Sequence, residues 1–324
     1  MPTQQLDYFT SLVAEDEHLP LTEAAVAVAQ HAYPDLDVQG VLDQIDQWGT
    51  KLKQRITPDT PPIQRLQLLK HFFYNELGFG PNPNDFYAPE NSYLHQIIEN
   101  RRGIPISLAI LMMELGQQIG LNIRGVSFPN HFMMRISLQQ GEIIMDPLTG
   151  ESLSKNQLQE MLDPYLDAKG YRGELSLPLN IFLRASSSRE ILSRFSLSKN
   201  QLQEMLDPYL DAKGYRGELS LPLNIFLRAS SAREILSRFM RNLKMIYSED
   251  ERWERLLGIQ ERLVILLPDS MEEIRDRGLI FAQLEYVRPA LEDMHRYLSE
   301  MPGAEDAADI REHIATLESQ TKLH

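Results

Sequence analysis

The sequence predicts an α+β protein that is mostly helical, with a small antiparallel sheet at its centre and helical repeats at its C-terminal end. Three observations support this fold class. Apolar residues recur at helical spacing through the first hundred residues, the period shortens to that of strands between residues 122 and 146, and helical spacing returns beyond residue 240. A chain of 324 residues with 43% hydrophobic residues can form more than one domain.

Residues 1–99 are predicted to form the helical N-terminal part of a core domain. Helices are expected over residues 21–31, 38–55 and 63–77, because each follows a proline or a Pro-Asp pair and carries apolar residues near a 3.6-residue spacing. The glycines and prolines of residues 78–83 must end the last helix, since proline removes a hydrogen-bond donor and glycine readily adopts positive φ.

Residues 100–151 are predicted to hold the centre of this core. They begin with a turn at Gly103, a proline suited to a first helical turn and apolar residues on all sides, which indicates a buried helix. An antiparallel meander is expected after the helix, because short segments rich in Val, Ile, Phe and Met follow one another. The expected strands are residues 123–128, 131–138 and 142–146, with a hairpin-like turn at Gln139, Gln140 and Gly141.

Residues 152–195 are repeated almost unchanged at residues 196–239: 43 of 44 positions are identical, and the single difference is Ser188 against Ala232. Solenoid repeats keep only a sparse pattern of packing positions, so this pair indicates a recent copying event. Either copy could occupy the native place. We expect the spare copy to pack imperfectly or to promote association, because its amphipathic segments would lack a partner, and we expect deletion of one copy to leave the fold intact.

Residues 235–324 are predicted to form helical repeats. Pro268 and Pro302 lie 34 residues apart, each at the end of a helix-turn-helix pattern, and 34 residues is the period of tetratricopeptide repeats. Two such repeats are expected, followed by a closing helix over residues 304–318, although the first repeat has Lys244 where a small residue is usual. A generic helical bundle is the alternative. The positions expected to make contacts between helices in the second repeat are Gly278, Phe281, Ala290 and Met294.

The composition excludes several classes of function. The chain has no cysteine, which rules out disulfides, thiolate metal sites and a cysteine nucleophile. Its formal net charge is -14, and an acidic surface repels phosphate backbones, which argues against nucleic-acid binding. The first ten residues lack a signal-peptide pattern and the most apolar run, residues 104–115, is too short to span a bilayer, so we expect a cytoplasmic protein without membrane contact.

Ser107, His131 and Asp146 are the candidate catalytic residues. Ser107 falls in the first turn of the buried helix, where free N–H groups and the helix dipole stabilise a negative charge. His131 at one strand start and Asp146 at the end of the next strand could meet at one edge of the meander, where the carboxylate would orient the imidazole. The structural alternatives are a helix cap for Ser107, an exposed turn for His131 and a turn of the Asp-Pro type for Asp146.

A metal site is the weaker interpretation of these residues. His131, Asp146 and His95 are the only nearby side chains of types that bind metals, which is too few for a positioned set of ligands. We therefore expect no metal and no cofactor.

Five short stretches carry a family resemblance: FYNELGF at 73–79, NSYL at 91–94, NRRGIPISL at 100–108, GVSFPNHF at 125–132 and DP at 146–147. With them, the order of a helix, a histidine strand and an aspartate strand resembles that of the transglutaminase-like superfamily. The chain resembles the bacterial SirB family, whose members look like a transglutaminase-type core followed by tetratricopeptide-like repeats. The resemblance covers the chain except for the extra copy, and it implies that His131 and Asp146 stand at the superfamily's His and Asp positions and Ser107 at or near its cysteine position.

This resemblance implies the frame of a thiol enzyme that lacks its nucleophile, because transglutaminases form their acyl-enzyme on a thiolate. We expect a non-catalytic regulatory or scaffold protein, a pseudoenzyme that binds a protein or peptide partner through its tetratricopeptide-like helices. Residues 240–324 hold 11 basic and 18 acidic residues, which favours a basic partner. The alternative is an acyl-transfer or amide-hydrolysing enzyme that uses Ser107, His131 and Asp146, and metal-dependent hydrolysis is a third interpretation.

Overall fold

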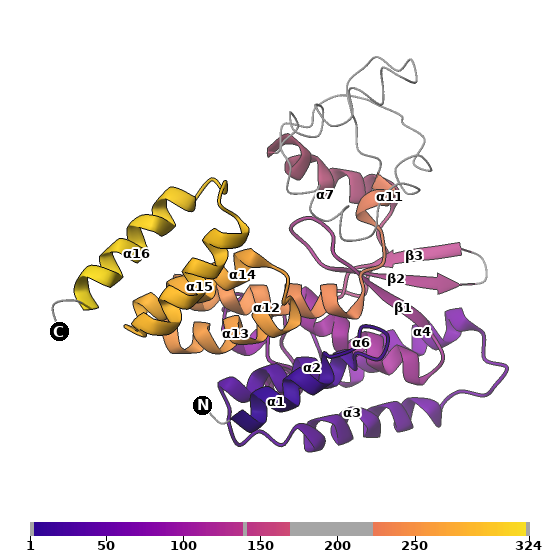
Figure 1. Cartoon of the computed structure of the whole chain (residues 1–324). Helices are drawn as coiled ribbons and strands as arrows, with labels where there is room; N and C mark the ends of the chain where they lie inside the picture. The colour runs from indigo at the N-terminus through magenta and orange to yellow at the C-terminus, as the bar shows by residue number, and fades with distance from the viewer. Residues whose placement is uncertain (1–2, 139–140, 169–222, 322–324) are drawn as a thin grey trace, which may run out of the picture.

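A computed structural model describes residues 3–138, 141–168 and 223–321 of the chain. Figure 1 shows the N-terminal helices packed below a small sheet, with the C-terminal helices extending away on the opposite side of the core. Two expectations fall largely outside the described residues. One is the hairpin turn at Gln139 and Gln140. The other is the imperfect packing or association expected of the spare copy, because the middle of the duplicated segment is not described.

The N-terminal region is helical, and the three helices predicted there are present. α3 begins where the sequence indicates, because the Asp37 carboxylate accepts a hydrogen bond from the Gly40 N–H at 3.0 Å and caps the helix. Two further helices, α1 and α5, were not predicted. The helices are α1 (Thr3–Leu12), α2 (Leu21–Val28, continued by a 3₁₀ turn, Ala29–His31), α3 (Val38–Lys53), α4 (Pro62–Lys70, continued by a π-helical stretch, His71–Glu76) and α5 (Leu94–Asn100).

α6 (Pro105–Gln118) runs through the middle of the core. Every residue from Ile106 to Met112 is buried, as the apolar wheel of this segment predicts. α2 also contributes small side chains to the core, because Ala24, Ala25 and Ala27 are fully buried and allow neighbouring helices to approach closely. The result is one continuous apolar core that includes residues from α1 to α14.

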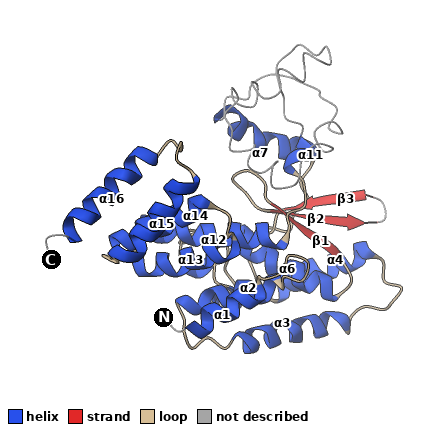
Figure 2. Cartoon of the chain, in the orientation of Figure 1, coloured by secondary structure: helices blue, strands red, loops and turns tan. Residues whose placement is uncertain are grey.

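The sheet has the predicted antiparallel order β1-β2-β3 (Figure 2). Its strands are β1 (Asn122–Val126), β2 (Met133–Leu138) and β3 (Gly141–Met145). Ile123 lies opposite Ile136, and Met134 lies opposite Met145, so the buried side chains of neighbouring strands share one face. β2 begins two residues later than expected, which leaves His131 in the turn before the strand.

The described parts of the duplicated segment come from both copies. α7 (Lys155–Ala168) belongs to the first copy, whereas α11 (Leu223–Phe226) belongs to the second. The two helices pack on the sheet through a small apolar cluster that includes Phe128, Leu162 and Phe226. The first copy is fixed at its start, where Ser152 forms a β-bridge with Met145. The second copy is fixed at its end, where one helix, Ala232–Glu249, continues past residue 239 into the C-terminal region.

The C-terminal helices form two antiparallel pairs and a closing helix, in agreement with the predicted repeats. Gly278 lies where two helices touch, because a β-carbon there would be 3.1 Å from Cβ of Asp293 and 3.2 Å from Cγ of Met294. The helical spacing therefore placed this contact correctly. The helices are α12 (Ala232–Glu249), α13 (Trp253–Leu266), α14 (Met271–Gln283), α15 (Val287–Glu300) and α16 (Ala307–Thr321).

The repeat helices pack directly on the core. α12 contacts α2 and α6, and α13 contacts α1. The Tyr247 hydroxyl of α12 lies 2.6 Å from the Tyr93 hydroxyl, which lies 3.3 Å from Nε2 of His31. Burial lowers the pKa of His31 to about 3, so the ring is neutral and its Nδ1–H donates to the Val28 carbonyl at 2.8 Å. Among the described residues, no helix combines the length and apolar character that a membrane span requires.

Candidate functional site

His131 and Asp146 lie together at one edge of the sheet. Nε2 of His131 is 3.3 Å from Oδ2 of Asp146, and the two side chains are 17% and 19% exposed. The register explains the contact: Met134 pairs with Met145, so the residues just before β2 and just after β3 reach the same edge. The meander therefore brings the predicted histidine and aspartate together.

The turn that carries His131 is held by the first repeat helix. Arg238 of α12 donates one hydrogen bond to the Phe128 carbonyl at 2.9 Å and another to the His131 carbonyl at 2.8 Å. Asn130 adopts a φ of 55°, which lets the chain reverse before β2. Burial lowers the pKa of Arg238, but the two carbonyl acceptors satisfy its guanidinium. The position of His131 thus depends on a residue 107 positions later in the sequence.

Asp146 is held mainly by backbone groups of the turn that follows β3. Its Oδ1 accepts a hydrogen bond from the Leu148 N–H at 2.7 Å, which leaves Oδ2 facing His131. The Tyr74 hydroxyl donates to the Pro147 carbonyl at 2.9 Å from the other side of this turn. Burial and the nearby charge of Asp146 raise the pKa of Tyr74, so this phenol stays a donor at neutral pH.

The contact between His131 and Asp146 is an ion-pair distance without hydrogen-bond geometry. Nε2 of His131 is buried and has no hydrogen-bond partner among the described residues. Nε2 of His131 is therefore free to make a hydrogen bond with a bound molecule, but the aspartate does not lock the ring as a triad carboxylate does.

Ser107 is fully buried, and its hydroxyl is used by the start of α6. Its Oγ lies 2.8 Å from the Asn91 carbonyl and 2.9 Å from the Ile104 carbonyl, either of which can accept its proton, and it accepts from the Ile104 N–H at 3.1 Å. Gly103 makes this turn possible, since a β-carbon there would lie 2.9 Å from Oγ of Ser107. The geometry of Ser107 is that of a helix cap, the structural alternative for this residue.

A pocket of about 140 Å³, the His131 pocket, opens beside the histidine. It meets the start of α6 through Ile104, Pro105 and Ile106, and Ser107 is not among its lining residues. Pro105, two residues before Ser107, lines this pocket together with His131 and has no side-chain nucleophile. The remaining lining residues are Phe86, Tyr87, Asn130, Phe132, Arg238, Asn242, Met245 and Ile246.

The apolar mouth of this pocket was missed in the sequence. Phe86, Tyr87 and Met245 are 40%, 65% and 45% exposed, which is unusual for large apolar side chains. The adjacent Phe86 and Tyr87 lie in a polar turn segment, and two aromatic residues in such a segment could have indicated an exposed apolar surface. Met245 could not be assigned to the pocket from sequence, because it lies far along the chain in α12.

His95, the third residue weighed as a metal ligand, lies elsewhere in the core. Its ring packs edge-on against Tyr33 with centroids 4.5 Å apart, and burial lowers its pKa to about 4. In the part of the chain that the structure describes, no three His, Asp or Glu side chains gather as a metal site.

Comparisons with known proteins agree with this architecture. A family model described as transglutaminase-like superfamily matches residues 39–197, and a tetratricopeptide repeat model matches residues 243–315. Protein SirB1 of Salmonella typhimurium is 24% identical over 312 residues, which is 96% of this chain and 97% of that protein. These matches agree with the resemblance to SirB-type proteins over most of the chain.

Other SirB-type relatives also match over most of their length. A UPF0162 protein of Xylella fastidiosa strain Temecula1 is 29% identical over 307 residues, covering 94% of this chain and 92% of the relative. UPF0162 protein YchA of Escherichia coli K12 is 25% identical over 287 residues, 87% of each chain. No solved structure gives a significant match.

The repeat helices enclose a second depression, the repeat groove, of about 320 Å³. It is lined by residues of α12, α13, α14 and α16. Its lining combines polar and apolar side chains, which can provide both hydrogen bonds and apolar contacts for a peptide. The residues that line it include Lys244, Ser248, Leu256, Asp276, Leu279, Gln283 and His313.

Proposed function

We propose that this protein is a non-catalytic regulatory or scaffold protein, which binds a protein partner in the repeat groove. The observation that carries the first part is the lining of the His131 pocket. Among the described residues that line it, none is a serine, a threonine or a cysteine, and Pro105 of the helix start lines it together with His131. Acyl transfer through a covalent intermediate needs a nucleophile within hydrogen-bond reach of its base.

The second part of the proposal is supported by the repeat groove and its charge. Tetratricopeptide repeats stack helices into concave surfaces on which peptides dock. Residues 240–324 hold 18 acidic and 11 basic residues, and this excess attracts a basic partner and speeds its encounter.

Partner binding is tested with matched variants of the full-length chain. Ser248→Arg with Gln283→Arg places two exposed cations inside the groove, whereas Ser299→Arg with Ser319→Arg adds the same charge at exposed positions outside it. We look for a partner that the unaltered chain and the Ser299→Arg, Ser319→Arg variant capture from a bacterial lysate, and that the Ser248→Arg, Gln283→Arg variant does not capture. This partner is then purified, and its affinity for each of the three chains is measured by titration. Equal affinity for the three chains contradicts the proposal.

The alternative, an acyl-transfer or amide hydrolase that uses Ser107, His131 and Asp146, has a direct test. We expect a serine-directed phosphonylating probe to leave Ser107 unlabelled in the folded protein, because its hydroxyl is buried and hydrogen-bonded to the backbone. Peptide mass spectrometry after labelling gives the readout. Labelling of Ser107 that disappears in His131→Ala would establish the enzyme instead.

A further inference from the structure

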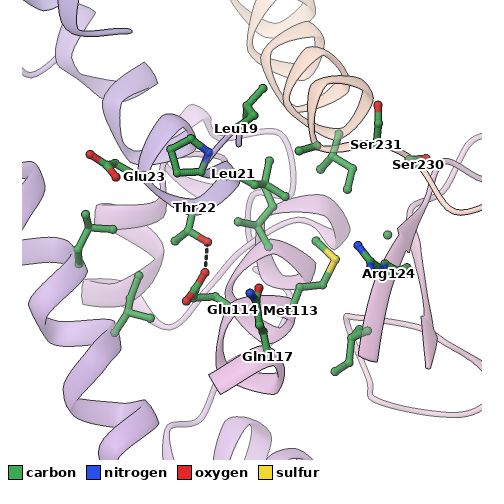
Figure 3. A pocket seen from close by; sticks show the side chains of 18 of the residues that line it. Leu19, Leu21, Thr22, Glu23, Met113, Glu114, Gln117, Arg124, Ser230 and Ser231 are labelled. Atoms are coloured by element: carbon green, nitrogen blue, oxygen red, sulfur yellow. Dashed lines mark hydrogen bonds between the residues drawn. The ribbon is translucent and has the colours of Figure 1, made fainter. Parts of the chain in front are cut away.

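The core contains a further depression, the acidic hollow, of about 860 Å³. It opens between α2, α3, α6, β1 and the start of α12, and it shares no described lining residue with the His131 pocket or the repeat groove. Figure 3 shows Met113 and Glu114 on α6 between Leu21 and Thr22 of α2 and Arg124 on the strand. The volume is within the range of about 300–1,000 Å³ that ligand pockets occupy.

The deepest lining side chains of the acidic hollow are apolar. Ile45 and Ile110 are each 1% exposed and Ile123 is 8% exposed, and they come from α3, α6 and β1 respectively. Leu21 and Met113 are half-buried beside them. Aliphatic side chains of a bound molecule would gain free energy by covering this surface.

The rim is strongly acidic. Arg124 is the only basic side chain among the described lining residues, and Asp16 is already paired with Arg233, which lies outside the lining. The acidic lining residues are Asp16, Glu17, Glu23, Asp46 and Glu114.

Neutral donors hold three of these carboxylates in place. Glu114 accepts from the Thr22 hydroxyl at 2.9 Å, and Nε2 of Gln118 donates to both Glu114 and Asp46, at 3.0 and 2.8 Å. The Tyr8 hydroxyl donates to Glu23. Within the described residues, no Lys or Arg forms an ion pair with these three carboxylates, so their orientation is fixed while their charge is unneutralised.

We propose that the acidic hollow binds a basic segment of a partner protein in which Lys or Arg alternates with aliphatic residues. Glu23, Asp46 and Glu114 stand on three separate helices around an apolar floor, and such a segment can reach them while its aliphatic side chains cover the floor. A small polyvalent cation would satisfy the rim and leave the floor in water. The charge complementarity gives both affinity and encounter rate.

The probe is a fluorescein-labelled synthetic peptide in which lysine alternates with leucine, titrated with the full-length chain by fluorescence anisotropy. Two matched peptides separate the contributions: lysine alternating with serine removes the apolar part, and glutamate alternating with leucine reverses the charge. We expect the lysine-leucine peptide to bind, the lysine-serine peptide to bind at least about fivefold more weakly, and the glutamate peptide not to bind.

Matched variants locate the site. Glu17→Lys with Asp46→Lys reverses two exposed rim charges, and Asp59→Lys with Glu300→Lys makes the same change in net charge away from the hollow. We expect the rim pair to weaken binding roughly tenfold and the distant pair by less than about twofold. Gln117→Trp, at an exposed lining position, should block binding without a change in charge.

Several results would overturn the proposal. An equal loss in the rim and distant pairs would indicate attraction to the overall charge, and equal binding of the lysine-leucine and lysine-serine peptides would show that the floor is not used. Displacement of the peptide by spermidine alone, with the same dependence on Glu17 and Asp46, would identify a small cation as the ligand. Ser248→Arg with Gln283→Arg changes the repeat groove and should leave the affinity of the acidic hollow for the peptide unchanged. The proposal for the acidic hollow can therefore fail while the proposal for the repeat groove stands, and the reverse.

Discussion

Ser107 stands where a nucleophile and a helix cap require the same kind of residue, a small polar side chain in the first turn. What distinguishes the two roles is where the hydroxyl's hydrogen bonds go. In this protein they go to the carbonyls of Asn91 and Ile104 and to the Ile104 N–H. The Asn91 carbonyl lies 16 residues earlier, so no pattern around Ser107 itself could reveal it.

Ser107→Ala should lower the free energy of unfolding by about 1–3 kcal/mol, because it leaves buried backbone groups with fewer partners. Urea denaturation measures the change. Ser299→Ala removes a hydroxyl that bonds the Arg296 carbonyl on an exposed helix surface, and it should alter stability by less than about 0.5 kcal/mol. Equal changes in the free energy of unfolding for Ser107→Ala and Ser299→Ala would contradict the capping role of Ser107.

Arg238→Leu should destabilise the protein by about 2–3 kcal/mol, because two charged hydrogen bonds to the carbonyls of Phe128 and His131 are lost. The amide of His131, which donates to the Phe128 carbonyl at 3.2 Å, should then exchange faster with deuterium. Arg252→Leu, which breaks a pair with Asp250 whose side chains are 53% and 43% exposed, is the control. An unchanged exchange rate at His131 would contradict the positioning role.

At the scale of elements, the repeat pairs are joined by one buried carboxylate. Glu273 of α14 is 4% exposed, and it accepts from Lys244 and Arg241 of α12 and from Gln260 of α13. Lys244 occupies a position where a small residue was expected, and its ammonium reaches Glu273 at 2.8 Å. The lysine that departs from the repeat pattern therefore forms an ion pair between α12 and α14.

Stability should fall in acid because of Glu273. Burial raises the pKa of Glu273, but the charge of Lys244 and the hydrogen bonds from Lys244, Arg241 and Gln260 outweigh it, lowering the pKa from 4.5 to about 2. The contribution is complete above pH 4.5 and is lost as the pH falls through 2. Glu273→Gln should cost on the order of 2 kcal/mol at neutral pH and less towards pH 2.

Chemical denaturation at several pH values tests the Glu273 prediction. Glu15→Gln, at a side chain that is 77% exposed, is the control and should change the free energy of unfolding by less than about 0.5 kcal/mol at neutral pH. A constant difference between Glu273→Gln and the unaltered chain from pH 7 to pH 2 would contradict the assigned titration.

The elements that could be predicted are those with a local signal. α3 has a cap at Asp37 and amphipathic spacing, and the three strands show a change of period within the sequence. α5 has only seven residues and no side-chain cap, and it is stabilised by burial of Leu94 and Ile97. Such short helices form through tertiary packing, which a local pattern does not contain.

The candidate site was predictable only in part, for the same physical reason. His131 and Asp146 meet because successive strands of a meander reverse direction, which is a local rule. The rest of the pocket combines the start of α6 with Phe86 and with Met245 of α12. These contacts depend on how distant helices pack, and no spacing within a single segment encodes them.

At the scale of the whole molecule, the described structure contains the first 17 residues of one copy and the last 17 residues of the other. The described residues 152–168 belong to the first copy and residues 223–239 to the second, and together they cover the start and the end of one repeat unit. The connections of the chain on either side of the duplicated segment determine which part of each copy is used. Ser152 is bridged to Met145, and α12 runs without interruption across residues 239 and 240.

Deletion of residues 169–212 should leave the fold intact. It joins Ala168 to Lys213, which restores the sequence found at residues 168 and 169, and it retains α7, α11 and every contact between them. We expect an unchanged midpoint of thermal unfolding and an unchanged circular dichroism spectrum. A shortened chain that unfolds, or that loses the near-ultraviolet signal of its aromatic residues, would contradict this interpretation.

The hydrogen bonds of Arg238 also connect two events that occur far apart in the molecule. α12 lines the repeat groove through Lys244 and Ser248, and the same helix holds the turn of His131 through Arg238. A peptide that binds the groove more tightly in one orientation of α12 shifts the population of that orientation, and with it the shape of the pocket. Thermodynamic reciprocity then requires a molecule in the His131 pocket to change the affinity of the groove by the same factor. The His131 pocket would thus act as a receptor that reports on the state of the repeats.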